Sequence, residues 1–143
     1  MNPPRAWLSA TTFLEETQGP QACAALAARR KAFRALHERG CFVIPNPWDV
    51  GSARYLRSLG FPALATTSAG FAFSQGLPDS GDEVVVARDR CLGYIASIVD
   101  AVEVPVSADF MAGYGLKPED VAESCHALCG HGCGRSVDRG RDR

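Results

Sequence analysis

Residues 41–67 read CFVIPNPWDVGSARYLRSLGFPALATT, and this stretch decides the fold. It opens on a short apolar run at 41–44 and ends in a second one at 63–67. Between them, residues 50–59 carry a helical pattern that Gly60 closes. Short apolar runs predict buried strands, and a glycine directly after a helical pattern is typical of a helix end. The stretch therefore predicts a strand, a helix and a second strand in succession.

The same alternation continues on both sides of this unit. Before it, the alanine-rich segment 21–38 predicts a helix that ends at Gly40. After it, residues 82–102 carry apolar side chains at helical spacing, and 104–108 (VPVSA) predicts a third strand. A last helix is expected from Pro118, because proline is well tolerated in a first helical turn. Strands and helices that alternate through short connections imply parallel strands, so we expect an α/β fold.

Three parallel strands fit either an open doubly wound sheet or a (β/α)8 barrel. The chain has 143 residues, whereas a complete barrel typically needs ~250. The first strand is followed by NPWDVG at 46–51, which lacks the spaced glycines of a dinucleotide-binding fingerprint. This absence counts against a Rossmann-type sheet.

The composition is that of one globular domain. The chain is 46% hydrophobic, and its 15 basic and 16 acidic residues are interspersed, so we expect no nucleic-acid partner. The stretch 6–14 is too short for a membrane span and does not fit a secretory signal, so we expect no membrane partner and a cytoplasmic location. Three of the six cysteines, Cys23, Cys41 and Cys91, fall in apolar segments, which favours reduced thiols.

Candidate functional residues follow the carboxyl ends of the predicted strands, where the functional edge lies in either architecture. Asp49 fits either a site carboxylate or the N-cap of the next helix. The small residues 66–70 fit either an anion-binding nest or a tight turn, and Asp79 fits a site carboxylate or a turn former. Asp109, followed by GYG at 113–115, fits either a magnesium ligand or a loop cap.

Three ordered blocks of sequence resemble one enzyme family. They are residues 42–54 (FVIPNPWDVGSAR), 63–72 (ALATTSAGFA), and 105–109 (PVSAD) with GYG at 113–115. These blocks are similar to the phosphoenolpyruvate mutase/isocitrate lyase superfamily, nearest its carboxyvinyl-carboxyphosphonate phosphorylmutase-like members. The resemblance covers about residues 30–123. It implies an incomplete (β/α)8 barrel of the TIM type, with an N-terminal helix and about three βα units.

The resemblance also implies a chemistry and the residues that carry it. The family cleaves or forms C–C or P–C bonds of small 2-oxo or 2-hydroxy acids through an enolate that magnesium holds. On this sequence, Ser68, Ala69 and Gly70 would bind the substrate carboxylate. Asp109 would contact the magnesium shell, and Asp79 would be the catalytic residue on a loop that gates the site. The expected partner is therefore a small acid, the expected cofactor Mg²⁺, and the expected assembly of the full-length family a homo-oligomer.

One residue departs from the family pattern inside the matched region. Met111 stands two positions after Asp109, where family members usually place a second carboxylate. A thioether is a weak acceptor that suits a hard cation poorly. Together with the missing second half of the barrel, this departure favours an alternative, a truncated and catalytically inactive fragment or pseudoenzyme.

The C-terminal segment follows a different pattern. Residues 125–133 (CHALCGHGC) crowd cysteine and histidine, but the C-x3-C-x3-C spacing is not a common zinc pattern. We interpret residues 124–143 as an aberrant tail, with a frame-shifted reading of the gene as the hypothesis. Residues 21–123 are then the partial barrel domain, and residues 1–20 a flexible N-terminal extension.

Overall fold

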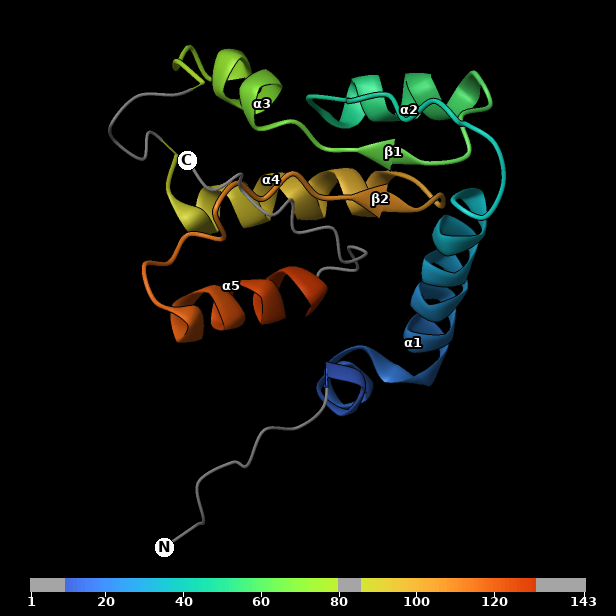
Figure 1. Cartoon of the computed structure of the whole chain (residues 1–143), viewed down its shortest axis with the longest axis horizontal. Coiled ribbons are helices and arrows are strands. Elements are labelled where there is room, and N and C mark those ends of the chain that lie inside the picture. Colours follow the sequence, from blue (N-terminus) through green and yellow to red (C-terminus); the bar gives the residue numbers. More distant parts are fainter. Residues whose placement is uncertain (1–9, 80–85, 131–143) are drawn as a thin grey trace, which may run out of the picture.

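The computed structural model describes residues 10–79 and 86–130. Within these ranges the chain alternates helices and short strands, from the blue N-terminal end to the red C-terminal end (Figure 1). The elements in chain order are α1 (Ala10–Leu36), α2 (Val50–Ser58), β1 (Leu64–Ala65), α3 (Ser68–Ser74), α4 (Arg88–Ala101), β2 (Val106–Ser107) and α5 (Pro118–Gly130). None of the described helices is long and apolar enough to cross a membrane.

β1 and β2 form a parallel two-stranded sheet, in which Leu64 lies opposite Val106 and Ala65 opposite Ser107. Parallel neighbours need a crossover connection, and α3 and α4 lie on the segment that joins them. The second and third expected strands are thus present in shortened form. The mixed helix and sheet organisation with parallel strands is confirmed.

The first expected strand, at 41–44, is not part of the sheet. Residues 41–47 run without regular structure, and Pro45 meets β1 where its carbonyl accepts the Ala65 N–H at 3.1 Å. Val43 keeps 68% of its surface exposed. An apolar run becomes a strand only where a neighbour pairs with successive residues, and β1 meets this segment near its end. The prediction of a buried strand here is therefore wrong.

The second expected loop, at 66–79, contains a helix that sequence reasoning missed. α3 begins directly after Thr67, whose hydroxyl accepts the Gly70 N–H at 3.1 Å and caps the first turn. Phe71 is buried, and its ring stacks on Tyr94 of α4 with the centroids 4.1 Å apart. The small residues suggested a turn, but packing of an apolar helical face against α4 stabilises a short helix.

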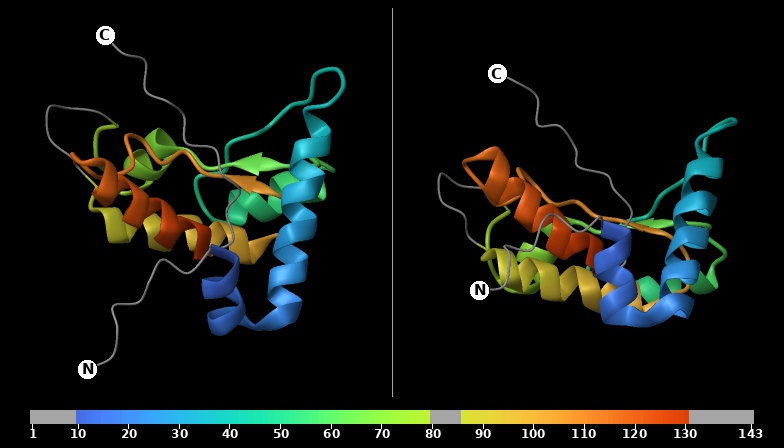
Figure 2. Two further views of the ribbon diagram at one scale, coloured as in Figure 1. Left: turned by 60° about the horizontal axis from the view of Figure 1, so that its bottom comes forward. Right: turned by 90° about the horizontal axis from the view of Figure 1, so that it is seen from below.

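α1 begins earlier than expected. It starts at Ala10 rather than at Gln21, so residues 10–20 of the expected extension are helical. Figures 1 and 2 show a sharp bend in α1 near its N-terminal end. The sequence there includes Gly19-Pro20, and a proline both removes a helical donor and bends the backbone. The pattern that suggested a loose extension therefore produces a bent helix.

Two further boundaries differ from expectation. α4 begins at Arg88 rather than at Asp82, and residues 80–85 lie outside the described part of the chain. α5 runs to Gly130, so residues 124–130 of the expected tail continue this helix. The rest of that tail, 131–143, also lies outside the described residues.

α4 lies at the centre of the described core. Its Ile95 and Ile98 are fully buried, as are Leu64 of β1 and Phe110 just after β2. α4 packs against α2 and α5, and Figure 2 shows α2 and α4 on the same side of the two strands. This arrangement holds the loops that follow β1 and β2 next to each other.

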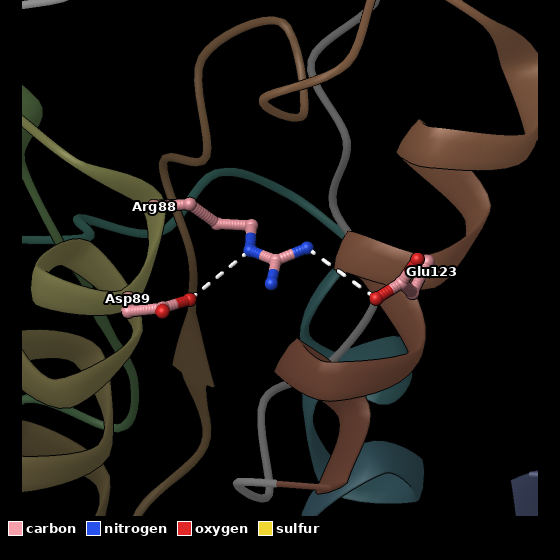
Figure 3. Close-up of polar contacts among 3 residues, drawn as sticks. All are labelled: Arg88, Asp89 and Glu123. Atoms are coloured by element: carbon pink, nitrogen blue, oxygen red, sulfur yellow. Dashed lines mark hydrogen bonds and ion pairs between the residues drawn. The ribbon is translucent and has the colours of Figure 1, made fainter.

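Arg88, the first residue of α4, joins α4 to α5 (Figure 3). Its Nε lies 3.1 Å from Asp89 Oδ1, and its Nη1 lies 3.6 Å from Glu123 Oε1. The Asp89 contact, and to a smaller extent Glu123, raises the pKa of the Arg88 guanidinium. The Asp89 and Glu123 side chains are exposed and Arg88 is partly exposed, so this bridge adds little to stability.

Candidate functional site

The loops that follow β1 and β2, together with Asn46, enclose a cleft at the carboxyl ends of the strands. The cleft has a volume of about 420 Å³. It is lined by Asn46, Ala65, Thr66, Thr67, Ser107, Ala108 and Asp109. The position matches the functional edge expected for parallel strands.

Ser68 brings two acidic side chains together beside this cleft. Its backbone N–H donates to Asp109 Oδ2 at 3.0 Å, and its hydroxyl lies 3.5 Å from Asp79 Oδ1, at the limit of a hydrogen bond. These residues come from α3, from the loop that follows it, and from the end of β2. Three of the predicted site residues therefore meet, although they are up to 41 positions apart in the sequence.

The Asp109 carboxylate is held by backbone groups on both oxygens. Oδ2 accepts the Ser68 N–H, and Oδ1 accepts the Met111 N–H at 3.3 Å. A carboxylate oxygen donor is thus oriented beside the cleft.

Ala69 and Gly70 follow Ser68 in the first turn of α3, and Ala69 is partly buried. The Gly70 N–H donates to the Thr67 hydroxyl, so it is engaged in the helix cap. A Cβ at position 70 would lie 2.6 Å from Thr67 Cγ2 and 3.1 Å from Trp48 Cβ. Gly70 is therefore required for the close approach of α3 to the loop before α2.

Asn46 and Thr66 both line the cleft, and Thr66 belongs to the stretch 66–70 that fitted either an anion-binding nest or a tight turn. Asn46 Nδ2 donates to the Ala65 carbonyl at 3.1 Å, and Thr66 Oγ1 accepts the Asp109 N–H at 3.0 Å. Both are polar residues directly after an apolar run. The position after the carboxyl end of a predicted strand, which selected Asp109, also selects the loops that begin at these two residues.

Asp49 acts as the cap of α2. Its Oδ1 accepts the Ser52 N–H at 2.6 Å, and the Asp49 N–H donates to Ser52 Oγ at 3.1 Å, which completes a capping box. The hydrogen bond from Ser52 lowers the pKa of the Asp49 carboxyl. Of the two roles that its position allowed, capping is the one the structure shows.

Two buried side chains of α4, Cys91 and Tyr94, also have raised pKa values. Burial raises the pKa of the Cys91 thiol and raises the pKa of Tyr94 to about 12. The Tyr94 hydroxyl donates to the Pro47 carbonyl at 3.0 Å. Both groups therefore stay protonated at neutral pH.

The donor chemistry fits a magnesium ion that keeps several of its waters. Asp109, Asp79 and the Ser68 hydroxyl are hard oxygen donors, and magnesium typically takes one or two carboxylates. Met111 adds only a thioether. Within residues 10–79 and 86–130, no three His, Cys, Asp or Glu side chains cluster closely enough to form an all-protein metal cage.

Known proteins resemble this chain in sequence and in structure. An uncharacterized protein of Mycobacterium tuberculosis is 37% identical over 93 residues, which are 64% of this chain and 34% of that protein. A crystal structure from Burkholderia cenocepacia J2315, assigned as a lyase/mutase, is 50% identical with a TM-score of 0.71 over 76% of this chain and 38% of that one. 2,3-Dimethylmalate lyase, a PEP mutase/isocitrate lyase superfamily member, is 30% identical with a TM-score of 0.62 over 76% of this chain and 37% of its own.

The chain spans about a third of the length of the curated relative that it matches. The sequence model of the phosphoenolpyruvate phosphomutase family matches residues 33–135, which is well over half of the chain. This match extends past Glu123, where the resemblance read from the sequence ended. The chain therefore belongs to the phosphoenolpyruvate phosphomutase family, within the PEP mutase/isocitrate lyase superfamily.

Proposed function

We propose that this chain carries the acid-binding part of a magnesium-dependent lyase or mutase, which acts on C–C or P–C bonds of small 2-oxo or 2-hydroxy acids through an enolate. The contact of Ser68 with both Asp79 and Asp109 is the observation that carries the proposal. It places two carboxylates and a hydroxyl beside one cleft. Family membership supplies the reaction class.

Each residue has a distinct role in this proposal. Ser68, with Ala69 and Gly70, binds the substrate carboxylate, and the Ser68 hydroxyl can donate to it. Asp109 holds Mg²⁺, which when bound supplies Lewis-acid stabilisation of an enolate oxyanion. Asp79 is exposed on the loop after α3, where its carboxylate can accept or return a proton at the edge of the cleft.

We also propose that the described elements are the first part of a (β/α)8 barrel, with an N-terminal helix and about three βα units. The parallel pairing of β1 with β2 supports this architecture. So does the position of α2 and α4 on one side of the strands (Figure 2). The match to 38% of a solved chain at a TM-score of 0.71 also supports the proposal.

A specific observation favours a second function, that of a catalytically inactive fragment or pseudoenzyme. Met111 is 44% exposed beside Asp109, and its thioether stands where the family resemblance places a second carboxylate. Loss of one hard ligand weakens magnesium binding without removing the cleft. In this reading the chain binds acids but does not turn them over.

Binding and turnover assays with matched aspartate variants test both functions. Oxalate is a suitable probe, because it is a planar dicarboxylate that resembles the enolate of a 2-oxo acid. The 143-residue chain is titrated with oxalate in the presence of Mg²⁺, and products from 2,3-dimethylmalate and phosphoenolpyruvate are followed by NMR. Asp109→Asn should abolish magnesium-dependent binding, whereas Asp100→Asn, on the exposed surface of α4, should leave it unchanged.

The outcomes separate the two functions. Turnover that depends on Mg²⁺ and on Asp109 supports the enzyme. Magnesium-dependent binding without turnover supports the inactive fragment. A wild-type chain that binds oxalate no better than Asp109→Asn contradicts the assignment of this cleft.

A further inference from the structure

Thr66 occupies a special position at the end of β1. Its side chain is buried, with 2% of the residue surface exposed, yet it lines the cleft. Its backbone N–H donates to the Ser107 carbonyl at 2.9 Å, which continues the pairing with β2. A buried hydroxyl normally has a specific hydrogen-bond partner, so the partner of this one indicates what the residue does.

That partner is the backbone of Asp109. Thr66 Oγ1 accepts the Asp109 N–H at 3.0 Å, across 43 positions of sequence. β1 and β2 pair at Ala65 and Ser107, so this side-chain bond links the two segments that follow the strands, just past the last paired residues. It ties the loop after β2 to the segment that leads into α3.

The position of the Asp109 carboxylate depends on the distance between its backbone and the start of α3. Asp109 Oδ2 accepts the Ser68 N–H at 3.0 Å, and Ser68 is only two residues after Thr66. The same short segment thus holds both the backbone and the side chain of Asp109. A shift of the Asp109 backbone by ~1 Å would carry the carboxylate out of hydrogen-bond range of Ser68.

We propose that Thr66 is a positioning residue for Asp109, whose hydroxyl keeps the carboxylate aimed at the cleft so that it can bind a divalent cation. The inference rests on the magnesium role proposed for Asp109. Thr66 itself needs no contact with the cation. Residues that orient a metal ligand typically affect metal affinity by about 10–100-fold when they are changed.

Two substitutions of Thr66 separate the effect of its hydroxyl from the effect of its side-chain shape. Thr66→Val keeps the size and branching but leaves the Asp109 N–H without its acceptor. Thr66→Ser keeps the acceptor and removes only a methyl group. Positioning therefore predicts loss of metal affinity in Thr66→Val and its recovery in Thr66→Ser.

The measurement uses Mn²⁺ as the probe for an oxygen-donor magnesium site. Free Mn²⁺ is titrated by EPR into the full 143-residue chain at a temperature well below unfolding. Asp109→Asn defines the affinity without this ligand, and Ile98→Val, at a fully buried position of α4, controls for general loss of stability. We expect Thr66→Val to weaken Mn²⁺ binding about tenfold or more, while Thr66→Ser and Ile98→Val stay close to wild type.

Three results would overturn the inference. Equal affinity of wild type and Thr66→Val shows that the hydroxyl does not position Asp109. Equal weakening in Thr66→Val and Ile98→Val shows a loss of stability rather than of positioning. A wild-type affinity no better than that of Asp109→Asn contradicts the magnesium role of Asp109, and with it the inference on Thr66.

Discussion

Met111 combines an unusual backbone with an unsuitable side chain. Its φ of 47° lies in the left-handed region, which non-glycine residues rarely adopt and which Asp and Asn tolerate best. The Met111 N–H nevertheless donates a hydrogen bond to Asp109 Oδ1. The backbone at this position is thus arranged around Asp109, while the side chain contributes no hard donor.

We predict that Met111→Asp tightens magnesium binding. The new carboxylate is a hard oxygen donor near Asp109, and aspartate fits the left-handed backbone better than methionine does. The expected gain is about tenfold in affinity, or ~1.4 kcal/mol, measured by Mn²⁺ titration with Mg²⁺ competition. Met111→Asn is the matched control, because it relieves the backbone without adding charge. If the two variants bind the cation equally well, this loop does not hold a metal.

At the scale of elements, α2 shows how local sequence and burial act together. The helix has nine residues, which is too short to be stable alone. The Asp49–Ser52 capping box satisfies donors at its N-terminus, and Ala53 is fully buried. Its expected bounds, 50–59, agree closely with the observed Val50–Ser58, because both signals lie within the helix itself.

The capping role of Asp49 leads to a prediction for the free energy of unfolding and its dependence on pH. Asp49→Ala should cost about 1 kcal/mol of unfolding free energy at neutral pH, as measured by urea unfolding with circular dichroism. Folding lowers the pKa of Asp49, so its contribution is complete above the unfolded-state pKa of about 3.9 and is lost as the pH falls through the lower folded value. The gap between wild type and Asp49→Ala should therefore narrow below that pH.

Asp49→Asn serves as the control for charge. Asparagine also caps helices well, but it does not titrate. The difference in unfolding free energy between Asp49→Asn and Asp49→Ala should stay constant with pH. A pH-independent gap between wild type and Asp49→Ala would contradict the role of the carboxylate.

At the scale of the whole molecule, the described sheet is small and open. It has two paired strands, and Val43 beside them is 68% exposed. In a closed barrel every strand has two neighbours, whereas an open edge presents unpaired backbone groups to other chains. Open edges and exposed apolar side chains favour association.

We predict that the purified 143-residue chain is oligomeric, prone to aggregation or only partly ordered. The helices α1 and α4 should persist, since their stability depends less on pairing with distant strands. Light scattering coupled to size exclusion, with urea unfolding followed by two probes, checks this expectation. A monodisperse monomer that unfolds in one cooperative transition would refute it, because such behaviour requires a self-sufficient core.

The sequence by itself determined the parallel α/β class, the positions of α2, β1 and β2, and the loops that follow the two strands. These properties depend on neighbours within one or two turns of the chain, so residue patterns report them directly. The three blocks around 42–54, 63–72 and 105–115 also indicated the family, which the match to residues 33–135 confirms.

Only the tertiary structure decided which residues pair or form hydrogen bonds with distant parts of the chain. It left the apolar run 41–44 unpaired as a strand, made a helix of residues 68–74, and brought the Ser68 N–H and the Thr66 hydroxyl to Asp109. Strand pairing and side-chain hydrogen bonds join groups that are about 20 to 43 positions apart. A local pattern shows that a residue can donate, accept or be buried, but the folded chain alone determines which distant group meets it.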